Sequence, residues 1–480
     1  MKPNIIFMLI DDLGWRDLSC YGSVFYETPV LDRLAKEGMQ FSNAYASCPV
    51  CSPTRASIMT GRYPARVGVT HYIGGKDYGK LLHVPYTREL PLAEKSLASV
   101  LKKAGYATWH VGKWHLGDEP YYPEKHGFDV NIGGCNMGYP YSGFWSPWNI
   151  PTLENGKDGE YITDHLTDRA IDLIRNREKD QPFFLNLWHY AVHVPIQAHS
   201  KDIAYFEEKA RRLGLDRRNA FVEGEFFPGS HPGCIGKRIV RRVVQSDPEY
   251  AAMVYNLDQN IGRVLNELIN QGIDRETIII FVSDNGGVST SEGSPTCNRP
   301  LAEGKGWMYE GGLKVPQIIK WDGHIKPGSI CNELVTSTDF YPTLLDYAGL
   351  PSMPEQHKDG VSLVPILDGK GGLDREAIFW HFPHYGNQGG SPACSVRRGK
   401  YKLIRFFEDD HLELYDLEND KGERDDLYFS HPEIAGELDS LLSAWLKDVC
   451  AKIPELNPEW KPPVLELNKI IPGIIAGIHP

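Results

Sequence analysis

Long apolar runs are missing from this chain of 480 residues. The first apolar stretch, residues 5–10, runs directly into Asp11 and Asp12. It is therefore too short for the core of a signal peptide and far from the ~20 residues that a membrane-spanning helix needs. We expect no membrane association and, for the sequence as written, a cytoplasmic protein. A leader removed before residue 1 would instead make it periplasmic or secreted.

Basic charge and cysteine are also scarce. Acidic residues outnumber basic ones by 63 to 51, and the net charge is −12. The one local basic cluster, residues 237–242, has no interleaved aromatic residues, so we expect no nucleic-acid binding and interpret the cluster as a solvated insertion. Nine cysteines spread over a long chain do not form the pattern of a disulfide framework. Most are therefore predicted to be reduced and buried.

Short apolar runs rich in Ile, Val and Phe alternate with segments of helical period. This alternation predicts an α/β fold with a central, mostly parallel sheet that helices cover on both faces. The expected strands are 5–10, 107–111, 183–188 and 277–282, and the expected helices are 29–37, 92–103, 163–177, 248–270 and 337–347.

A break in composition near residues 369–374 divides the chain. We predict a large α/β domain at 1–372 and a smaller α+β subdomain at 373–450, with an antiparallel sheet and one helix at 432–450. Residues 451–480 are rich in proline and are expected to form an extended tail. Such a tail either wraps over the surface of its own chain or reaches a neighbouring subunit. In the second case the protein would be a homo-oligomer.

Acidic residues follow two of the expected strands at the point where each strand ends. Asp11 and Asp12 follow the first, and Asp284 and Asn285 follow the strand at 277–282. Ligands bind at the carboxyl ends of strands in open α/β sheets. Three carboxylates and an amide oxygen would repel one another there without a cation, and an all-oxygen set favours Ca²⁺, or Mg²⁺, over zinc. Either motif alone would be a solvated turn; together they predict a metal site.

A second motif, Cys51-Ser-Pro-Thr-Arg55, precedes a segment that can continue as a helix up to Gly61. Pro53 suits a first helical position and Gly61 a helix end. Cys51 would then lie at a helix N-terminus, which attracts anions, and Arg55 one turn later could point to the same place. A lone cysteine is usually a small buried residue, but this spacing is far more specific.

The motif and the following Thr-Gly-Arg-Tyr-Pro, residues 60–64, resemble the signature of type I sulfatases of the alkaline phosphatase superfamily, and the similarity extends from residue 4 to about residue 315. In that family the motif cysteine is oxidised to formylglycine by a formylglycine-generating enzyme or an anaerobic sulfatase-maturing enzyme. The resemblance implies the family's fold with its C-terminal subdomain. It also implies these Ca²⁺ ligands: Asp11, Asp12, Asp284, Asn285 and the modified Cys51.

Four further residues resemble active-site positions of the family. Lys113 and His115 follow the strand at 107–111, His193 precedes a Val-Pro pair after the strand at 183–188, and Lys305 lies in a Gly-rich segment. Alone, each would more often be a surface lysine or a structural histidine, and Lys314 competes with Lys305.

These residues predict a reaction in which a formylglycine hydrate attacks the sulfur of a sulfate ester. We expect Arg55, Lys113 and Lys305 to bind the sulfuryl oxygens. His193, with Lys305 as an alternative, protonates the leaving alcohol, and His115 orients or deprotonates the hydrate.

The expected substrate is a sulfated carbohydrate, with aryl sulfates hydrolysed in vitro. Aromatic residues in 139–148 suit a sugar-binding rim, although packing explains them equally well. Weaker resemblances suggest substrate contacts from Ser142, His381, His384 and Asn387.

Two alternatives remain open. A phosphonate monoester or phosphodiester hydrolase shares the same Cys-x-Pro-x-Arg nucleophile. A non-catalytic binding protein on this fold should have lost at least one site position, whereas all ten are present here.

Overall fold

The computed structural model describes residues 2–228, 234 and 236–461. Its centre is a large mixed sheet with the strand order β11-β2-β10-β9-β1-β6-β4-β5, in which β10 runs antiparallel to its two neighbours. The other neighbouring strands are parallel, as expected for this fold class. The strands are β1 (Asn4–Ile10), β2 (Met39–Phe41), β4 (Ala107–Gly112), β5 (Val130–Ile132), β6 (Phe183–His189), β9 (Thr277–Ser283), β10 (Gln317–Lys320) and β11 (Ser329–Cys331).

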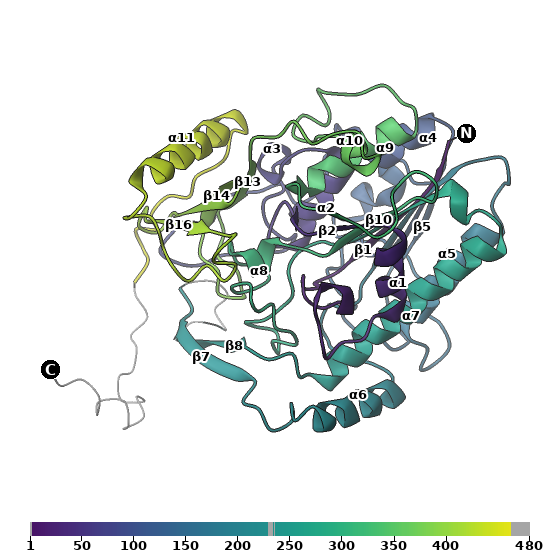
Figure 1. The fold of residues 1–480 in the computed structure, drawn as a ribbon, viewed down its shortest axis with the longest axis horizontal. Helices are drawn as coiled ribbons and strands as arrows, with labels where there is room; N and C mark the ends of the chain where they lie inside the picture. The colour runs from purple at the N-terminus through teal and green to yellow at the C-terminus, as the bar shows by residue number, and fades with distance from the viewer. Residues whose placement is uncertain (1, 229–233, 235, 462–480) are drawn as a thin grey trace.

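Helices cover both faces of this sheet (Figure 1). The core on one face includes side chains of α1 (Pro29–Glu37), α5 (Ile162–Arg175), α6 (Ser200–Arg212) and α7 (Pro248–Asn270). The core on the other face includes α2 (Cys51–Thr60), α4 (Leu97–Lys103), α9 (Phe340–Tyr347) and α10 (Val364–Leu367). Because β1, β6 and β9 are buried along their whole length, their sequences are apolar at most positions rather than alternating.

The four predicted strands are present, and helices 29–37 and 248–270 have the predicted bounds. Helix 163–177 is observed at Ile162–Arg175. The helix predicted at 92–103 begins only at Leu97, because the Ser96 hydroxyl caps it by accepting from the backbone N–H of Ser99. The helix predicted at 337–347 starts as one 3₁₀ turn, Ser337–Asp339, and continues as α9.

The C-terminal part forms a separate antiparallel sheet, β13-β14-β15-β16, covered by α11 (Pro432–Asp448) at the left of Figure 1. A shared core that includes Tyr45 and Trp380 packs this sheet against the main domain. Its strands are β13 (Ile378–Phe382), β14 (Ala393–Arg398), β15 (Tyr401–Phe406) and β16 (Leu412–Asp416).

In the tail, the backbone N–H of Asn457 donates to the carbonyl of Lys80, so its first residues lie along the main domain. Residues 462–480 of the predicted tail lie outside the described residues. Within the described chain, no helix combines the length and the apolar character needed to cross a bilayer.

The interpretation of residues 237–242 as a solvated insertion is wrong for two of its arginines. β8 (Arg238–Arg242) pairs with β7 (Phe221–Phe226) in a hairpin. Arg241 forms ion pairs with Glu225 and Glu303, and the buried Arg242 pairs with Asp247. Acidic partners, of which Glu303 is distant in the sequence and Asp247 is only five residues from Arg242, therefore neutralise these charges inside the fold.

All nine cysteines are free, and six of them are buried, which agrees with the prediction from their scattered positions.

Small elements complete the fold. These are β3 (Ala44–Tyr45) paired with β12 (Val335–Thr336), and the short helices α3 (Pro64–Val67) and α8 (Glu310–Leu313).

Candidate active site

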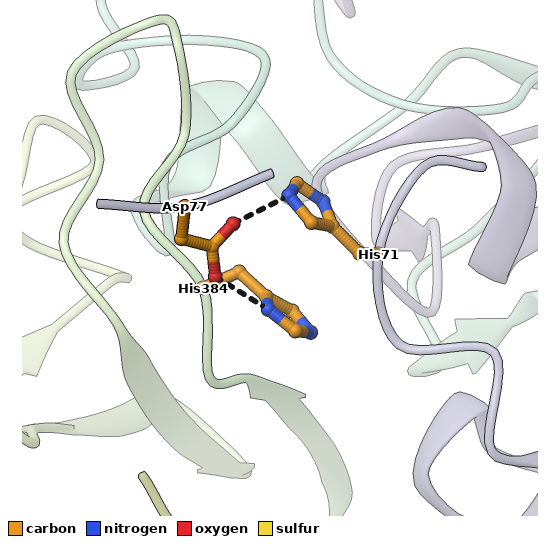
Figure 2. Close-up of side chains that lie close together, drawn as sticks. All are labelled: His71, Asp77 and His384. Atoms are coloured by element: carbon orange, nitrogen blue, oxygen red, sulfur yellow. Dashed lines mark hydrogen bonds and ion pairs between the residues drawn. The ribbon is translucent and has the colours of Figure 1, made fainter. Parts of the chain in front are cut away.

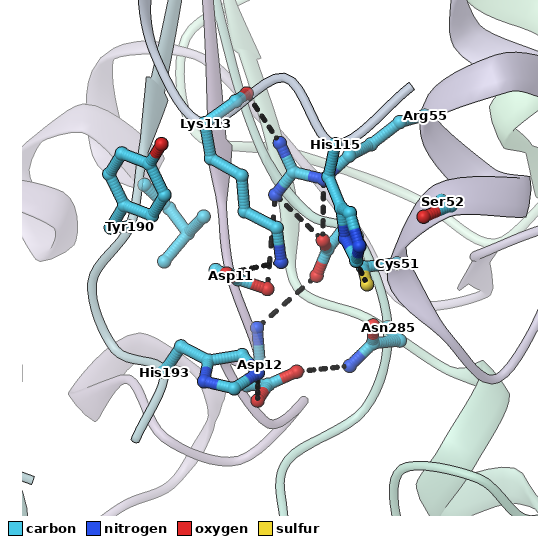
Figure 3. A network of polar contacts seen from close by, with 12 residues as sticks. Asp11, Asp12, Cys51, Ser52, Arg55, Lys113, His115, Tyr190, His193 and Asn285 are labelled. Carbon is cyan, nitrogen blue, oxygen red and sulfur yellow. Dashed lines mark hydrogen bonds and ion pairs between the residues drawn. The ribbon is translucent and has the colours of Figure 1, made fainter. Parts of the chain in front are cut away.

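The site lies at the carboxyl edge of the central strands. β1 pairs in parallel with β9, so that Ile10 lies opposite Ser283 and the acidic residues that follow both strands meet. The backbone N–H of Asp12 donates to Asp284 Oδ1 at 3.2 Å, and the Asn285 side chain donates to Asp12 Oδ1 at 2.8 Å (Figure 3). Asp12 adopts φ 62°, a conformation that is costly for a non-glycine residue and that clusters at functional sites.

Helix α2 places the cysteine motif against this edge. Cys51 is its first residue, two positions earlier than the prediction that Pro53 would begin the helix. The helix ends at Gly61, whose φ of 69° and hydrogen bond to Ser57 form the expected left-handed cap. The N-terminus of the helix, whose first N–H groups have no partner within the helix, therefore lies at residue 51.

Arg55 points back from α2 to the acidic cluster, with no exposed surface of its own. Its Nε and Nη2 donate to Asp284 Oδ2 at 3.0 and 2.7 Å, and its Nη1 donates to the carbonyl of Lys113 at 3.0 Å. Lys113 in turn donates to Asp11 Oδ2 at 2.7 Å. Two buried cations thus hold two of the carboxylates in fixed orientations.

The oxygen atoms of this cluster fit a hard divalent cation. Asp11 Oδ1 and Asn285 Oδ1 are buried and have no hydrogen-bond partner among the described residues. Orphaned oxygens of this kind are costly unless a cation takes them, and carboxylate and amide oxygens are ligands of Ca²⁺ and Mg²⁺. Asp11, Asp12 and His193 each also offer one atom within 4.8 Å of the others. The donor set is therefore suited to the predicted metal, with Asp284 beside it.

Burial and neighbouring charges shift the pKa values of Asp11 and Asp12 in opposite directions. Burial raises the pKa of Asp11 well above its usual value, although Lys113 opposes the shift. Burial alone would also raise the pKa of Asp12, but Lys305 and His193 outweigh it and lower the pKa. Lys305 donates to Asp12 Oδ2 at 2.8 Å, and this carboxylate raises the pKa of Lys305 despite its burial. Asp12 and Lys305 are therefore a buried ion pair.

Two histidines are held as neutral rings with defined tautomers. His115 Nε2 lies 3.0 Å from the carbonyl of Ile73, and His193 Nδ1 lies 2.9 Å from that of Val194. A carbonyl only accepts, so each of these nitrogens carries the hydrogen and the other is an acceptor. Burial lowers the pKa of His193 to about 4 and that of His115 well below its usual value.

The free nitrogens of these histidines face the reacting groups. His115 Nδ1 lies 3.3 Å from Cys51 Sγ, and His193 Nε2 lies 3.0 Å from Lys305 Nζ. Burial raises the pKa of the Cys51 thiol, so at neutral pH the thiol is protonated. An unmodified Cys51 is thus a poor nucleophile in this place.

A cavity of about 620 Å³ opens above Cys51. Of the sequence-predicted residues it is lined by Cys51, His115, His193, Lys305 and Asn387. Arg55 and Lys113 do not line it, because their cationic groups are turned to the acidic cluster beneath.

Three predicted substrate contacts also lie away from this cavity. Ser142 is exposed, and its hydroxyl accepts from Asn149. His381 belongs to β13 of the second sheet, and its Nε2 lies 3.0 Å from the carbonyl of Lys452. His384 is buried behind the cavity wall, beside Asp77. Lys314, the competitor of Lys305, is also elsewhere, next to Asn43.

Sequence reasoning missed several cavity residues. Glu292 adopts φ 54° and accepts from the side-chain amides of Asn387 and Gln388, at 2.7 and 2.9 Å. Tyr139 stacks on His193 with ring centroids 5.3 Å apart. Besides Asn387, the aromatic stretch at 139–148 was the sequence signal for this wall. Tyr139 and Tyr141 of that stretch line the cavity, whereas Trp148 is fully buried.

Comparison with known proteins gives a consistent result. The family described as "Sulfatase" matches residues 3–350, and the family described as "N-sulphoglucosamine sulphohydrolase, C-terminal" matches residues 303–449. The chain is 33% identical to a "Sulfatase" of Formosa agariphila, over 93% of this chain and 89% of that protein. It is 31% identical to N-acetylgalactosamine-6-sulfatase of Rattus norvegicus, over 97% and 90%. The crystal structure of Ps i-CgsB in complex with k-i-k-neocarrahexaose superposes with a TM-score of 0.75 at 27% identity, covering 97% of this chain and 96% of that one.

Proposed function

Since the chain belongs to the sulfatase family and is a sulfatase enzyme, we propose that it removes sulfate from a sulfated carbohydrate through a formylglycine made from Cys51. One observation carries the proposal: Cys51 begins α2 at the floor of the cavity, next to orphaned buried oxygens that suit a cation. The rat relative is named for N-acetylgalactosamine 6-sulfate, and the superposed structure contains a neocarrahexaose. Both names support a sugar substrate.

The residues of the cavity divide the work of the reaction. A bound Ca²⁺ supplies positive charge that favours an ionised hydroxyl on residue 51 and neutralises sulfuryl oxygens. Asp11, Asp12, Asp284 and Asn285 would hold this ion, and the modified residue 51 would complete the ligand set. Lys305 is the cation that reaches the cavity, so it binds a sulfuryl oxygen directly, whereas Arg55 and Lys113 act by holding Asp284 and Asp11.

One hydroxyl of the formylglycine hydrate loses its proton to solvent, and the oxyanion attacks the sulfur. A new O–S bond forms as the S–O bond to the leaving alcohol breaks. The alkoxide needs one proton. His193 Nε2 is a proton acceptor in the free protein, so Lys305 is the proton source and His193 positions or relays it.

The second half of the reaction regenerates the aldehyde. His115 Nδ1 is free and lies beside residue 51, so it takes the proton of the remaining hydroxyl. The resulting oxyanion collapses to the aldehyde and expels sulfate, and water then restores the hydrate. An unmodified thiol or a serine could not release sulfate by this route.

The test is the mass of the peptide that carries residue 51, measured on protein coexpressed with a maturation enzyme, together with turnover. We expect a loss of about 18 Da, the exchange of thiol for aldehyde, and sulfate release from sulfated galactosamine and from 4-nitrophenyl sulfate. Cys51→Ala is the control and should be inactive. Equal turnover by the unmodified thiol form would overturn the mechanism, and faster hydrolysis of an aryl phosphonate than of the sulfates would favour the phosphonate hydrolase alternative.

A further inference from the structure

A cluster of three histidines and one aspartate lies behind the wall of the cavity. We call His71, Asp77, His83 and His384 the histidine cluster; Figure 2 shows His71 and His384 beside the Asp77 carboxylate. His71 and His384 have no exposed side-chain surface, and that of Asp77 is 2% exposed. The side chain of His83 is partly exposed, at 33%. None of the four residues takes part in the proposed reaction.

The contacts in the histidine cluster are short, but not all of them have the geometry of a hydrogen bond. His384 Nδ1 lies 2.8 Å from Asp77 Oδ2, His71 Nε2 2.9 Å from Oδ1, and His83 Nδ1 3.2 Å from Oδ2. Yet His71 Nε2, Asp77 Oδ1 and His83 Nδ1 are buried atoms without a properly directed hydrogen bond to any described residue. Two orphaned imidazole nitrogens beside a carboxylate that has an orphaned oxygen of its own point to a missing partner.

We propose that the histidine cluster binds one zinc ion. The candidate ligand atoms of His71, Asp77 and His384 all lie within 4.8 Å of one another. His83 lies outside that group, but its Nδ1 is 3.2 Å from Asp77 Oδ2, so a rotation of its side chain toward the ion would complete the ligand set. Zinc bonds of 2.0–2.1 Å in a tetrahedron place ligand atoms about 3.3 Å apart, so small side-chain adjustments would admit the ion. Imidazole nitrogens with a single carboxylate favour zinc over calcium, which prefers oxygen.

The surroundings of His384 support this assignment. Its other nitrogen, Nε2, lies 2.9 Å from the hydroxyl of Thr70, the kind of outer contact that orients a metal-binding imidazole. Its ring also stacks on that of His71, with centroids 4.4 Å apart.

The ion would join two walls of the cavity. His71 and Asp77 flank Tyr72, Ile73 and Gly74, which line the cavity, and the carbonyl of Ile73 also orients His115. His384 precedes the cavity residues Asn387 and Gln388 in the loop after β13. Since all its ligands are protein side chains, the zinc is structural: it fastens the main-domain loop to the C-terminal loop.

Metal analysis tests the proposal. The protein is incubated with a small excess of Zn²⁺ in buffer containing excess Ca²⁺, which fills the oxygen-rich site, and is then desalted for elemental analysis. We expect about one zinc per chain, and less than about 0.2 in Asp77→Asn and His384→Gln. His381→Gln is the matched control: it is a buried histidine of the same region outside the cluster, and it should retain zinc. Equal zinc content in the cluster variants and the wild type would overturn the proposal.

A measurement on the unsubstituted chain covers the case in which the variants fail to fold. Co²⁺ bound at a tetrahedral site of three nitrogens and one oxygen gives intense visible absorption, which Zn²⁺ should abolish by displacement. Absence of these bands, or of any rise in Tm with Zn²⁺, would refute the site; we expect a rise on the order of 5 °C. Both measurements also work in Cys51→Ala, so the zinc proposal stands or falls independently of the sulfatase mechanism.

Discussion

Replacing Arg55 by methionine should both destabilise the protein and impair the site. The side chain is fully buried, and its guanidinium makes two hydrogen bonds to Asp284 and one to the carbonyl of Lys113. Methionine fills similar space without charge. Arg55→Met therefore leaves Asp284 as an uncompensated buried carboxylate and removes the partner of a backbone carbonyl.

The size of the effect follows from burial. Removing one partner of a buried ion pair costs about 3–5 kcal/mol of unfolding free energy. A bound cation at Asp11, Asp12 and Asp284 compensates the same carboxylates, so the loss should be largest without Ca²⁺ and smaller at saturating Ca²⁺. Because Arg55 orients a metal ligand without lining the cavity, kcat/KM should fall by about 10–100-fold even with Ca²⁺ present.

Urea denaturation with and without Ca²⁺, beside hydrolysis of 4-nitrophenyl sulfate, measures these effects. Arg398→Met is the matched control, because its guanidinium is 35% exposed and pairs with Glu376 and Glu437, an arrangement worth less than about 1 kcal/mol. The reasoning fails if Arg55→Met costs no more than this control in Ca²⁺-free buffer. Unchanged kcat/KM would refute the positioning role.

Three further outcomes are expected. Burial lowers the pKa of His110 from 6.5 to about 3, so the native state binds fewer protons than the unfolded state between these pH values. Stability that is present above pH 6.5 should thus be lost as the pH falls, by up to about 5 kcal/mol. His110→Phe should abolish this loss in acid titrations of unfolding, and an unchanged pH profile would contradict the prediction. Gly61→Ala should cost about 2–4 kcal/mol, because a Cβ there would lie 2.4 Å from that of His357. Gly349 has a left-handed backbone but open space around it, so Gly349→Ala should cost only about 1 kcal/mol. Equal melting temperatures for the two variants would show that the protein relieves the clash with His357. EGTA should abolish turnover and lower Tm, both reversibly with Ca²⁺; full activity after chelation would exclude the metal site.

Local pattern was enough to predict the central elements. Apolar runs marked β1, β6 and β9, and a segment of helical period marked α7. Parallel strands end at one edge of a sheet, so acidic residues after two such strands had to meet if the strands were neighbours. The sequence by itself therefore determined the fold class and the residues that gather beneath Cys51.

Tertiary packing alone decided which of these residues face the substrate. Arg55 and Lys113 turn to the acidic cluster rather than the cavity, and Glu292 enters its wall from a loop without any recognisable motif. His384 lies with His71 and Asp77, which are more than 300 residues away in the chain. Such contacts depend on the paths of loops and on long-range charge pairing, and neither leaves a periodic or local trace in the sequence.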